Sequence, residues 1–194
     1  MAPGMRRRLA PTLLALSWVL ASSRVGAEEP SVPVGLEAEL LAKVAAYDKH
    51  MGARAGDRLH VVILVKKGNP DSERASAQMA SAIGAMGQIG GLAHDELLLS
   101  YAGAGALAEV CRTKHAAIVF VTPGFADDVG AIAGALDGVD VLSASAIADY
   151  VAKGVVLGFD LVSGKPKLLV NLTQAKKQKV DLASEILKLM KVYE

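Results

Sequence analysis

The glycine motif Gly103-Ala-Gly105-Ala-Leu-Ala108 follows a segment with a strand-like pattern and could bind a dinucleotide. In such sites, the glycines let backbone amides approach a pyrophosphate at the start of a helix. The acidic residue expected after the next strand is missing, because Val121 leads directly into Thr122 and Pro123. The motif alone is weak evidence. We therefore interpret it as a turn of small residues that allows close helix packing, and we predict no cofactor.

Histidine, cysteine and serine show no spacing typical of a metal site or a catalytic site. No pair at helical metal-ligand spacing occurs among the four histidines, which are His50, His60, His94 and His115. The single cysteine, Cys111, excludes an internal disulfide and lies in a helical pattern, which predicts a buried, unreactive thiol. No Gly-x-Ser-x-Gly elbow occurs in the sequence. We therefore predict no metal, no catalytic residue and no enzymatic activity.

The loops that follow the predicted strands carry the remaining candidates for ligand binding. Ligands of open α/β sheets bind outside the carboxyl ends of the strands. Amides, hydroxyls and helix starts in these loops would suit a small anion or a polar solute, and ordinary turn and capping chemistry is the alternative role. The candidate residues are Lys66, Lys67, Asn69, Thr122, Ser143 and Ser145.

The first 27 residues have the pattern of a secretory signal peptide. Arg6-Arg7-Arg8 precede a short apolar stretch, and small residues end at Ala27. The apolar stretch is shorter than the ~20 residues that span a bilayer, which disfavours a membrane anchor. We predict cleavage after Ala27, export from the cytoplasm, an extended mature N-terminus over residues 28–35 and a single domain over residues 36–194.

The charge distribution disfavours nucleic acid as a partner. The 194 residues are 52% hydrophobic and 21% charged, a composition that suits a folded domain and excludes a disordered chain. The leader holds four arginines and no acid, so the mature chain carries 17 basic and 20 acidic side chains. A nucleic-acid-binding domain usually has a basic excess. Charges interrupt every later apolar run, so the mature chain is predicted to contain no transmembrane segment.

Hydrophobic periodicity predicts alternating strands and helices. A first helix is expected from Leu36 to Met51, stopped by Gly52. Strands are expected at 59–65, 96–101, 116–121 and 139–142, followed by helices at 71–87, 107–112, 127–136 and 145–153. Two further strands, 155–162 and 167–172, flank the hairpin signal at 163–166, and a final helix is expected from Gln174 to Val192. This pattern predicts a three-layer α/β/α sandwich with a mostly parallel sheet, a C-terminal antiparallel hairpin and a long final helix.

The carboxy-terminal third contains a characteristic succession of short motifs. They are Val139 to Ser143, Gly154-Val155-Val156, Gly158-Phe159-Asp160, Leu169-Val170-Asn171 and the segment from Leu182 to Leu189. In this order they resemble the motifs of the YfiR/HmsC family of exported bacterial regulators. Ala117 to Val121 looks like the family's preceding strand, and the sequence order matches from Leu36 to Val192. The chain departs from the family at Lys153, which replaces a glycine, and in having no cysteine pair.

The resemblance implies a periplasmic protein that acts by protein contact and not by catalysis. The best-known members bind the periplasmic sensor domain of an inner-membrane diguanylate cyclase and hold it inactive, and an outer-membrane-associated protein withdraws them. We therefore expect the partner to be a membrane-bound sensor protein, either a cyclase or a kinase. Whether the chain also forms a homodimer is left open. The residues expected to contact the partner are Leu40, Val44, Tyr47, Leu187 and Met190. The alternative is that each of them is an ordinary residue of the hydrophobic core. The alternative function is a periplasmic small-solute receptor.

Overall fold

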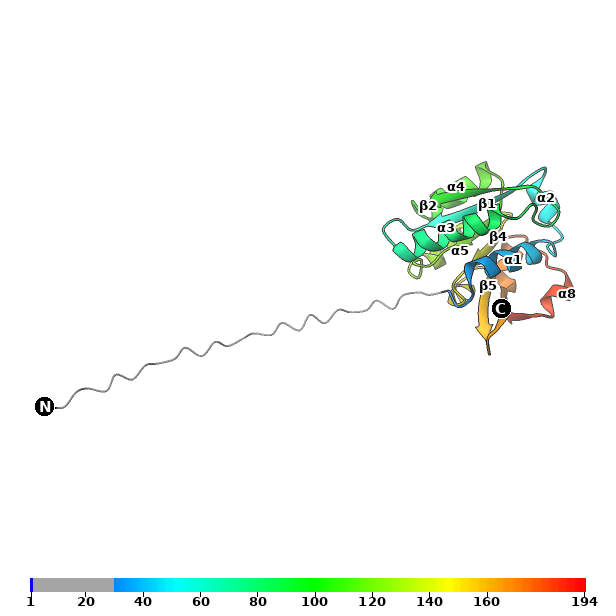
Figure 1. Ribbon diagram of the computed structural model, residues 1–194. Helices are drawn as coiled ribbons and strands as arrows, with labels where there is room; N and C mark the ends of the chain where they lie inside the picture. The colour runs from blue at the N-terminus through cyan, green and yellow to red at the C-terminus, as the bar shows by residue number, and fades with distance from the viewer. Residues whose placement is uncertain (2–29) are drawn as a thin grey trace.

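A seven-stranded sheet lies at the centre of the computed structural model, which describes Met1 and residues 30–194 (Figure 1). Its strands are β1 (Leu59–Val65), β2 (His94–Ser100), β3 (Ala116–Val121), β4 (Leu142–Ser145), β5 (Leu157–Val162), β6 (Lys165–Asn171) and β7 (Met190–Tyr193). They lie in the order β2-β1-β3-β4-β5-β6-β7. All neighbours run parallel except β5 and β6, which form an antiparallel hairpin. The predicted mostly parallel sheet and C-terminal hairpin are confirmed.

Helices cover both faces of this sheet and complete the three layers (Figure 1). The helices of the described residues are α1 (Val34–Ala45), α2 (Met51–Ala55), α3 (Pro70–Gly84), α4 (Ala104–Thr113), α5 (Val129–Ala135), α6 (Asp149–Ala152), α7 (Leu172–Lys177) and α8 (Ser184–Leu187). Leu41 of α1 and Met79 of α3 belong to the hydrophobic core on one face. Leu107 of α4 and Ile132 of α5 belong to the core on the other face.

The central strand β3 shows why an unbroken apolar run becomes an interior strand here. Ile118 and Phe120 point into the first core, and Val119 and Val121 point into the second. Strands of parallel sheets are covered by helices on both faces, so both sets of side chains must be apolar. Every residue of β3 is buried, and its bounds are those that the sequence predicts.

The predicted long final helix from Gln174 to Val192 is wrong. The structure has α7 and α8 in this region, followed by the edge strand β7. Lys179 adopts a left-handed backbone conformation with φ of 56°, which an α-helix does not accommodate. Pairing of β7 with β6, with Met190 beside Leu168, supplies the backbone hydrogen bonds that a helix would otherwise supply. Tertiary contacts thus override the helical pattern.

The predicted first helix, 36–51, is likewise divided. Helix α1 begins at Val34, inside the segment expected to be extended, and ends at Ala45. Gly52, expected to stop a helix, lies inside α2. The break occurs at Asp48, whose carboxylate Oδ1 accepts hydrogen bonds from the backbone N–H groups of His50 and Asp181. These bonds fix the chain in a turn where the sequence pattern alone favours a continuous helix.

The predicted signal peptide and its cleavage site lie outside the described residues. Within residues 30–194, no helix is long and apolar enough to cross a membrane.

Candidate functional site

The loops at the carboxyl ends of β1 and β3 lie together, as the sequence predicts for a parallel sheet. Ser72 Oγ lies 2.7 Å from Thr122 Oγ1 and accepts a 2.8 Å hydrogen bond from the backbone N–H of Lys66. Thr122 Oγ1 donates to the carbonyl of Leu64 at 2.7 Å. Asn69 Oδ1 accepts the N–H of Ser72 at 2.9 Å and caps α3. The polar groups of Asn69 and Thr122 are therefore used to join the loops to the fold.

The two lysines of the first loop differ in their surroundings. Lys66 Nζ pairs with Asp128 at 2.9 Å and lies 5.5 Å from the centre of the Phe125 ring. Lys67 is exposed. Lys66 is thus neutralised by a neighbour, and Lys67 is the more accessible cation of this loop.

Ser143 and Ser145 are not loop residues, because β4 begins three residues later than predicted and includes both. Ser143 Oγ accepts the N–H of Val156 at 3.0 Å, and Ser145 Oγ donates to the carbonyl of Val121 at 2.9 Å. Both serines are buried. These hydroxyls tie β4 to its neighbours, so the expectation that the two serines line a ligand loop is wrong.

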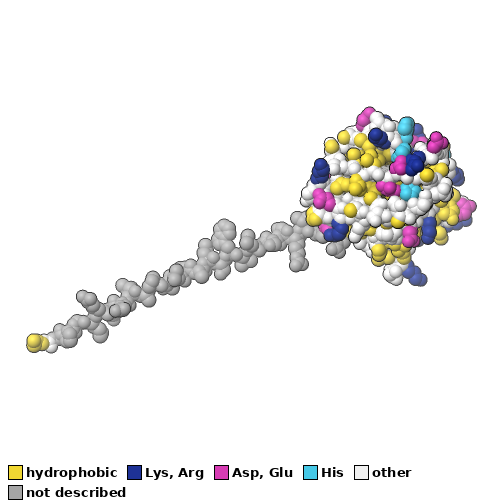
Figure 2. Space-filling view, turned by 45° about the horizontal axis from the view of Figure 1, so that its top comes forward, with side chains coloured by type: hydrophobic (Ala, Val, Ile, Leu, Met, Phe, Trp, Pro, Cys, Tyr) yellow, Lys and Arg dark blue, Asp and Glu magenta, His cyan; other side chains and the backbone are white. Residues whose placement is uncertain are grey.

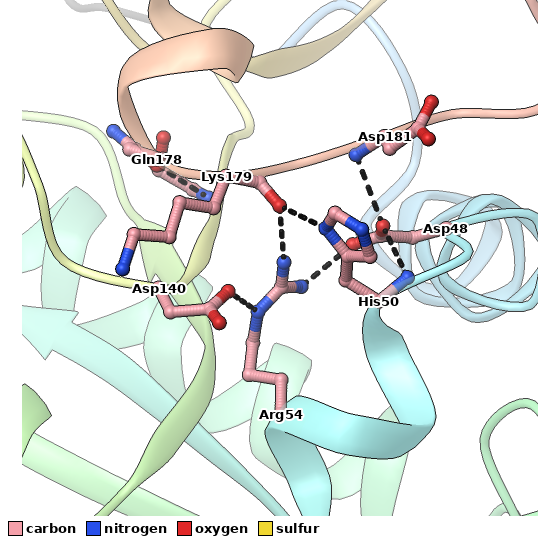
Figure 3. Close-up of polar contacts among 8 residues, drawn as sticks. Asp48, His50, Arg54, Asp140, Gln178, Lys179 and Asp181 are labelled. Carbon is pink, nitrogen blue, oxygen red and sulfur yellow. Dashed lines mark hydrogen bonds and ion pairs between the residues drawn. The ribbon is translucent and has the colours of Figure 1, made fainter.

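A polar cluster that the sequence does not reveal lies at the opposite end of the sheet (Figure 3). Arg54 donates from Nη1 to Asp48 at 2.6 Å, from Nε to Asp140 at 2.6 Å and from Nη2 to the carbonyl of Lys179 at 3.2 Å. Nδ1 of His50 lies 2.8 Å from the same carbonyl. The side chains of Arg54 and Asp48 are 2% and 0% exposed. This Asp48–Arg54 cluster joins α2 to the segment that replaces the predicted final helix.

A hollow of about 400 Å³ adjoins the cluster. Its walls include Arg54, Cys111, Arg112, His115 and Asp140. Arg112 has no hydrogen-bond or ion-pair partner among the described residues, so its guanidinium can meet a ligand. Burial raises the pKa of the Cys111 thiol to about 11, which leaves it protonated at neutral pH. The predicted unreactive cysteine is consistent with this environment.

Gly103 of the glycine motif and His94 take structural roles in the described part of the chain. Gly103 precedes α4 with φ of 110°, a conformation that glycine adopts without a Cβ penalty. His94 Nδ1 lies 2.5 Å from Glu96 and its Nε2 lies 2.9 Å from the carbonyl of Met86. Among residues 30–194, no three His, Cys, Asp or Glu side chains gather in a geometry that could hold a metal ion.

The predicted contact residues come together but are mostly covered. The end of α1 and the chain before α8 lie side by side, because the N–H of Ala183 donates to the carbonyl of Tyr47 at 2.9 Å. Val44 and Met190 are 0% and 7% exposed and belong to the core, so they form no surface in this structure. Tyr47 is 45% exposed. Leu40 and Leu187 are partly buried against the same core.

Exposed apolar side chains lie where the sequence predicts ordinary strand residues or, for Leu189, the inward face of the final helix. Leu161 and Val162 at the turn of the β5–β6 hairpin and Leu189 before β7 are 38%, 54% and 62% exposed. We refer to Leu161, Val162 and Leu189 together as the hairpin-end patch. Leu161 and Val162 are consecutive in β5 and so point to opposite faces of the hairpin, and Leu189 lies against β6, where its carbonyl accepts a hydrogen bond from Lys167 Nζ at 2.9 Å. Leu97 and Leu98 of β2 are 40% and 50% exposed. Figure 2 shows hydrophobic side chains interspersed with charged ones and histidines on one face of the molecule. Only the tertiary structure identifies these strands as exposed edges and turns.

Comparison with known proteins gives one family and a shared fold. The DUF4154 family, YfiR/HmsC-like, matches residues 93–191. No curated protein matches the chain.

Two solved structures are similar in fold. A conserved domain protein from Vibrio cholerae is 12% identical, with a TM-score of 0.56, over 84% of this chain and 60% of that chain. An "ABC domain in complex with L-Trp" from Streptococcus pneumoniae is 10% identical, with a TM-score of 0.58, over 82% of this chain and 61% of that chain. The chain thus spans less than two thirds of either solved chain, and at these identities the likeness concerns the fold alone.

Proposed function

Because this chain belongs to the YfiR/HmsC-like family, we propose that it is an exported periplasmic regulator that binds a membrane protein's sensor domain. The target is the periplasmic domain of an inner-membrane signalling protein, such as a diguanylate cyclase, which the bound regulator holds inactive. The observation that carries the proposal is the family match from the start of β2 into β7. Inhibition by binding needs only a higher affinity for the inactive state of the sensor than for its active state.

The distribution of polar and apolar groups supports a protein partner. The hydroxyls of Thr122, Ser143 and Ser145 are engaged in hydrogen bonds within the fold. The hairpin-end patch, in contrast, offers apolar surface to a partner. We propose this patch as the contact surface, with Tyr47 and the partly buried Leu40 and Leu187 as further candidates.

Leu189→Glu is expected to weaken binding to the cognate sensor domain at least about tenfold, because it introduces a charge into a desolvated apolar contact. Calorimetry of the purified protein against sensor domains encoded by neighbouring genes measures the affinity. Glu109→Ala on α4 is the matched surface control and should bind like the wild type. A wild-type protein that binds none of these domains would contradict the proposed function.

A receptor for a small anionic solute is the second candidate function. The observation in its favour is the hollow of about 400 Å³, to which Arg112 and His115 contribute basic side chains. Under this proposal, a carboxylate or phosphate group would pair with Arg112.

A thermal-shift screen of phosphate, dicarboxylates and amino acids, L-tryptophan included, separates the two candidates. A bound solute at 100 times its dissociation constant adds about 2.7 kcal/mol to the free energy of unfolding. Arg112→Ala should abolish the shift, whereas the exposed Lys67→Ala should preserve it. An unchanged melting temperature across the panel would contradict the receptor candidate.

A further inference from the structure

The strand β2 is one outer edge of the sheet, and the backbone groups that it turns away from β1 can be identified. The N–H of Leu59 donates to the carbonyl of Ala93 at 2.8 Å, and the N–H of Tyr101 donates to the carbonyl of Val65 at 2.9 Å. In a parallel ladder, the N–H and C=O of one residue point to the same side, and successive residues alternate. The odd-numbered residues of β2 therefore point to β1. The residues whose N–H and C=O groups face outward are His94, Glu96, Leu98 and Ser100. The carbonyl of His94 already accepts a hydrogen bond from Arg58 Nη1 at 3.1 Å, and its second lone pair can accept another.

This edge lacks the features that usually prevent strands from pairing. It is seven residues long, contains no proline or lysine and exposes Leu97 and Leu98, whose side chains lie on opposite faces. Its two acids are held by neighbours, since Asp95 pairs with Arg58 at 2.8 Å and Glu96 lies 2.5 Å from His94. The opposite edge, β7, is only four residues long and bears the exposed Lys191. The two edges of the sheet thus differ in their capacity to accept another strand.

We propose that a second copy of this chain pairs with β2 in an antiparallel arrangement, with Leu97 on the two-fold axis. Only this register pairs all four outward-facing residues of each copy. His94 then lies opposite Ser100 of the second copy, and Glu96 lies opposite Leu98 of the second copy. Eight backbone hydrogen bonds join the two sheets into one continuous sheet. The two-fold symmetry closes the assembly at a dimer.

Charge and side-chain packing favour this occupant. In the proposed register, Asp95 lies opposite Leu99 of the second copy. No acid lies opposite another acid, so the pairing avoids the repulsion that like charges on facing residues would cause. On the face that bears Leu97, the two copies of this leucine meet. Leu97 also lines a hollow of about 450 Å³ with Val62, Lys114 and His115, which the second copy would cover.

Cysteine cross-linking tests the register directly. Leu97 would form a non-hydrogen-bonded pair with its own copy at a Cα separation of about 4.5 Å, which a disulfide can bridge. We expect Leu97→Cys to give a covalent dimer under mild oxidation. Leu98→Cys is the matched control, because it is as exposed but lies about 8–9 Å from its own copy, beyond the range of a disulfide. The native Cys111 is buried and should add no background.

Sedimentation of protein purified after expression of the full chain tests the assembly itself. We expect a dimer whose dissociation constant rises at least about tenfold in Leu97→Lys, with circular dichroism unchanged. Val192→Lys on the other edge strand should leave the dimer intact. A wild-type monomer at about 0.1 mM would overturn the proposal. Cross-linking of Leu98→Cys in preference to Leu97→Cys would overturn the register.

Discussion

Glu37→Gln is expected to raise the free energy of unfolding markedly at pH 8 and to change it little at pH 4.5. Glu37 lies in the first turn of α1 with no solvent exposure, and neither carboxylate oxygen has a hydrogen-bond partner among the described residues. Burial raises the pKa of this carboxyl from 4.5 to about 8. The folded protein therefore holds Glu37 protonated at neutral pH, whereas the unfolded chain ionises it.

The sign of the pH dependence follows from this difference in proton binding. Below pH 4.5 the folded and unfolded states both bind the proton, and the stability contribution of the neutral carboxyl is present; at pH 4.5 the unfolded chain is half ionised and this contribution is still largely present. Between pH 4.5 and 8 the unfolded state releases the proton, so the wild-type protein loses stability as the pH rises. The loss at pH 8 is on the order of 3–5 kcal/mol, and glutamine, which cannot ionise, avoids it.

Urea denaturation from pH 4.5 to 8 measures the effect. Glu37→Met should also stabilise the protein at pH 4.5, because it removes the two unpartnered oxygens at similar volume. Glu39→Gln, an exposed position on the same helix, is the control and should follow the wild-type curve. A constant difference between wild type and Glu37→Gln across this pH range would contradict the assigned protonation.

Arg54→Met is expected to destabilise the protein by about 3–5 kcal/mol, because it leaves the carboxylate of Asp48 buried without its cation. Asp48 also accepts the backbone N–H groups of His50 and Asp181, so the loss should loosen the junction between α2 and residues 179–181 (Figure 3). We therefore expect faster amide exchange at Asp181 in addition to the lower urea midpoint.

A double-mutant cycle separates the buried ion pair from the exposed one. Arg54→Met combined with Asp48→Asn should lower the free energy of unfolding by clearly less than the sum of the two single changes, since the double variant has no unpaired buried charge. Asp140→Asn, whose carboxylate is 44% exposed, should cost less than about 1 kcal/mol. Additive costs for Asp48 and Arg54 would show that their interaction does not stabilise the fold.

The sequence correctly predicted the elements whose local hydrophobic or turn pattern matches their surroundings in the folded protein. The bounds of β3 are as predicted because an apolar run between two helices is buried on both faces. The β5–β6 hairpin is as predicted because its turn contains Gly164, which adopts φ of 74°. The final helix is not as predicted, because Val180, Leu182 and Ile186 fit a helical pattern but enter the core from a segment that turns at Lys179.

The candidate sites were predictable only where chain order determines position. Lys66 and Thr122 lie at one end of the sheet because parallel strands place their carboxyl ends together. The Asp48–Arg54 cluster includes Lys179, more than a hundred residues away, and no local pattern signals such a contact. The exposure of Leu97 depends on β2 being the edge strand, which only the strand order reveals.

The sequence by itself determined the alternation of strands and helices and the mostly parallel sheet, because hydrophobic periodicity and turn residues act locally. The tertiary structure decided the end of the chain, where pairing with β6 makes residues 190–193 a strand. It also decided that Val44 and Met190 are covered while Leu98 and Leu189 are exposed. A leucine has the same hydrophobicity in either place, and only its neighbours in space decide whether it contributes to the core or to a surface for a partner.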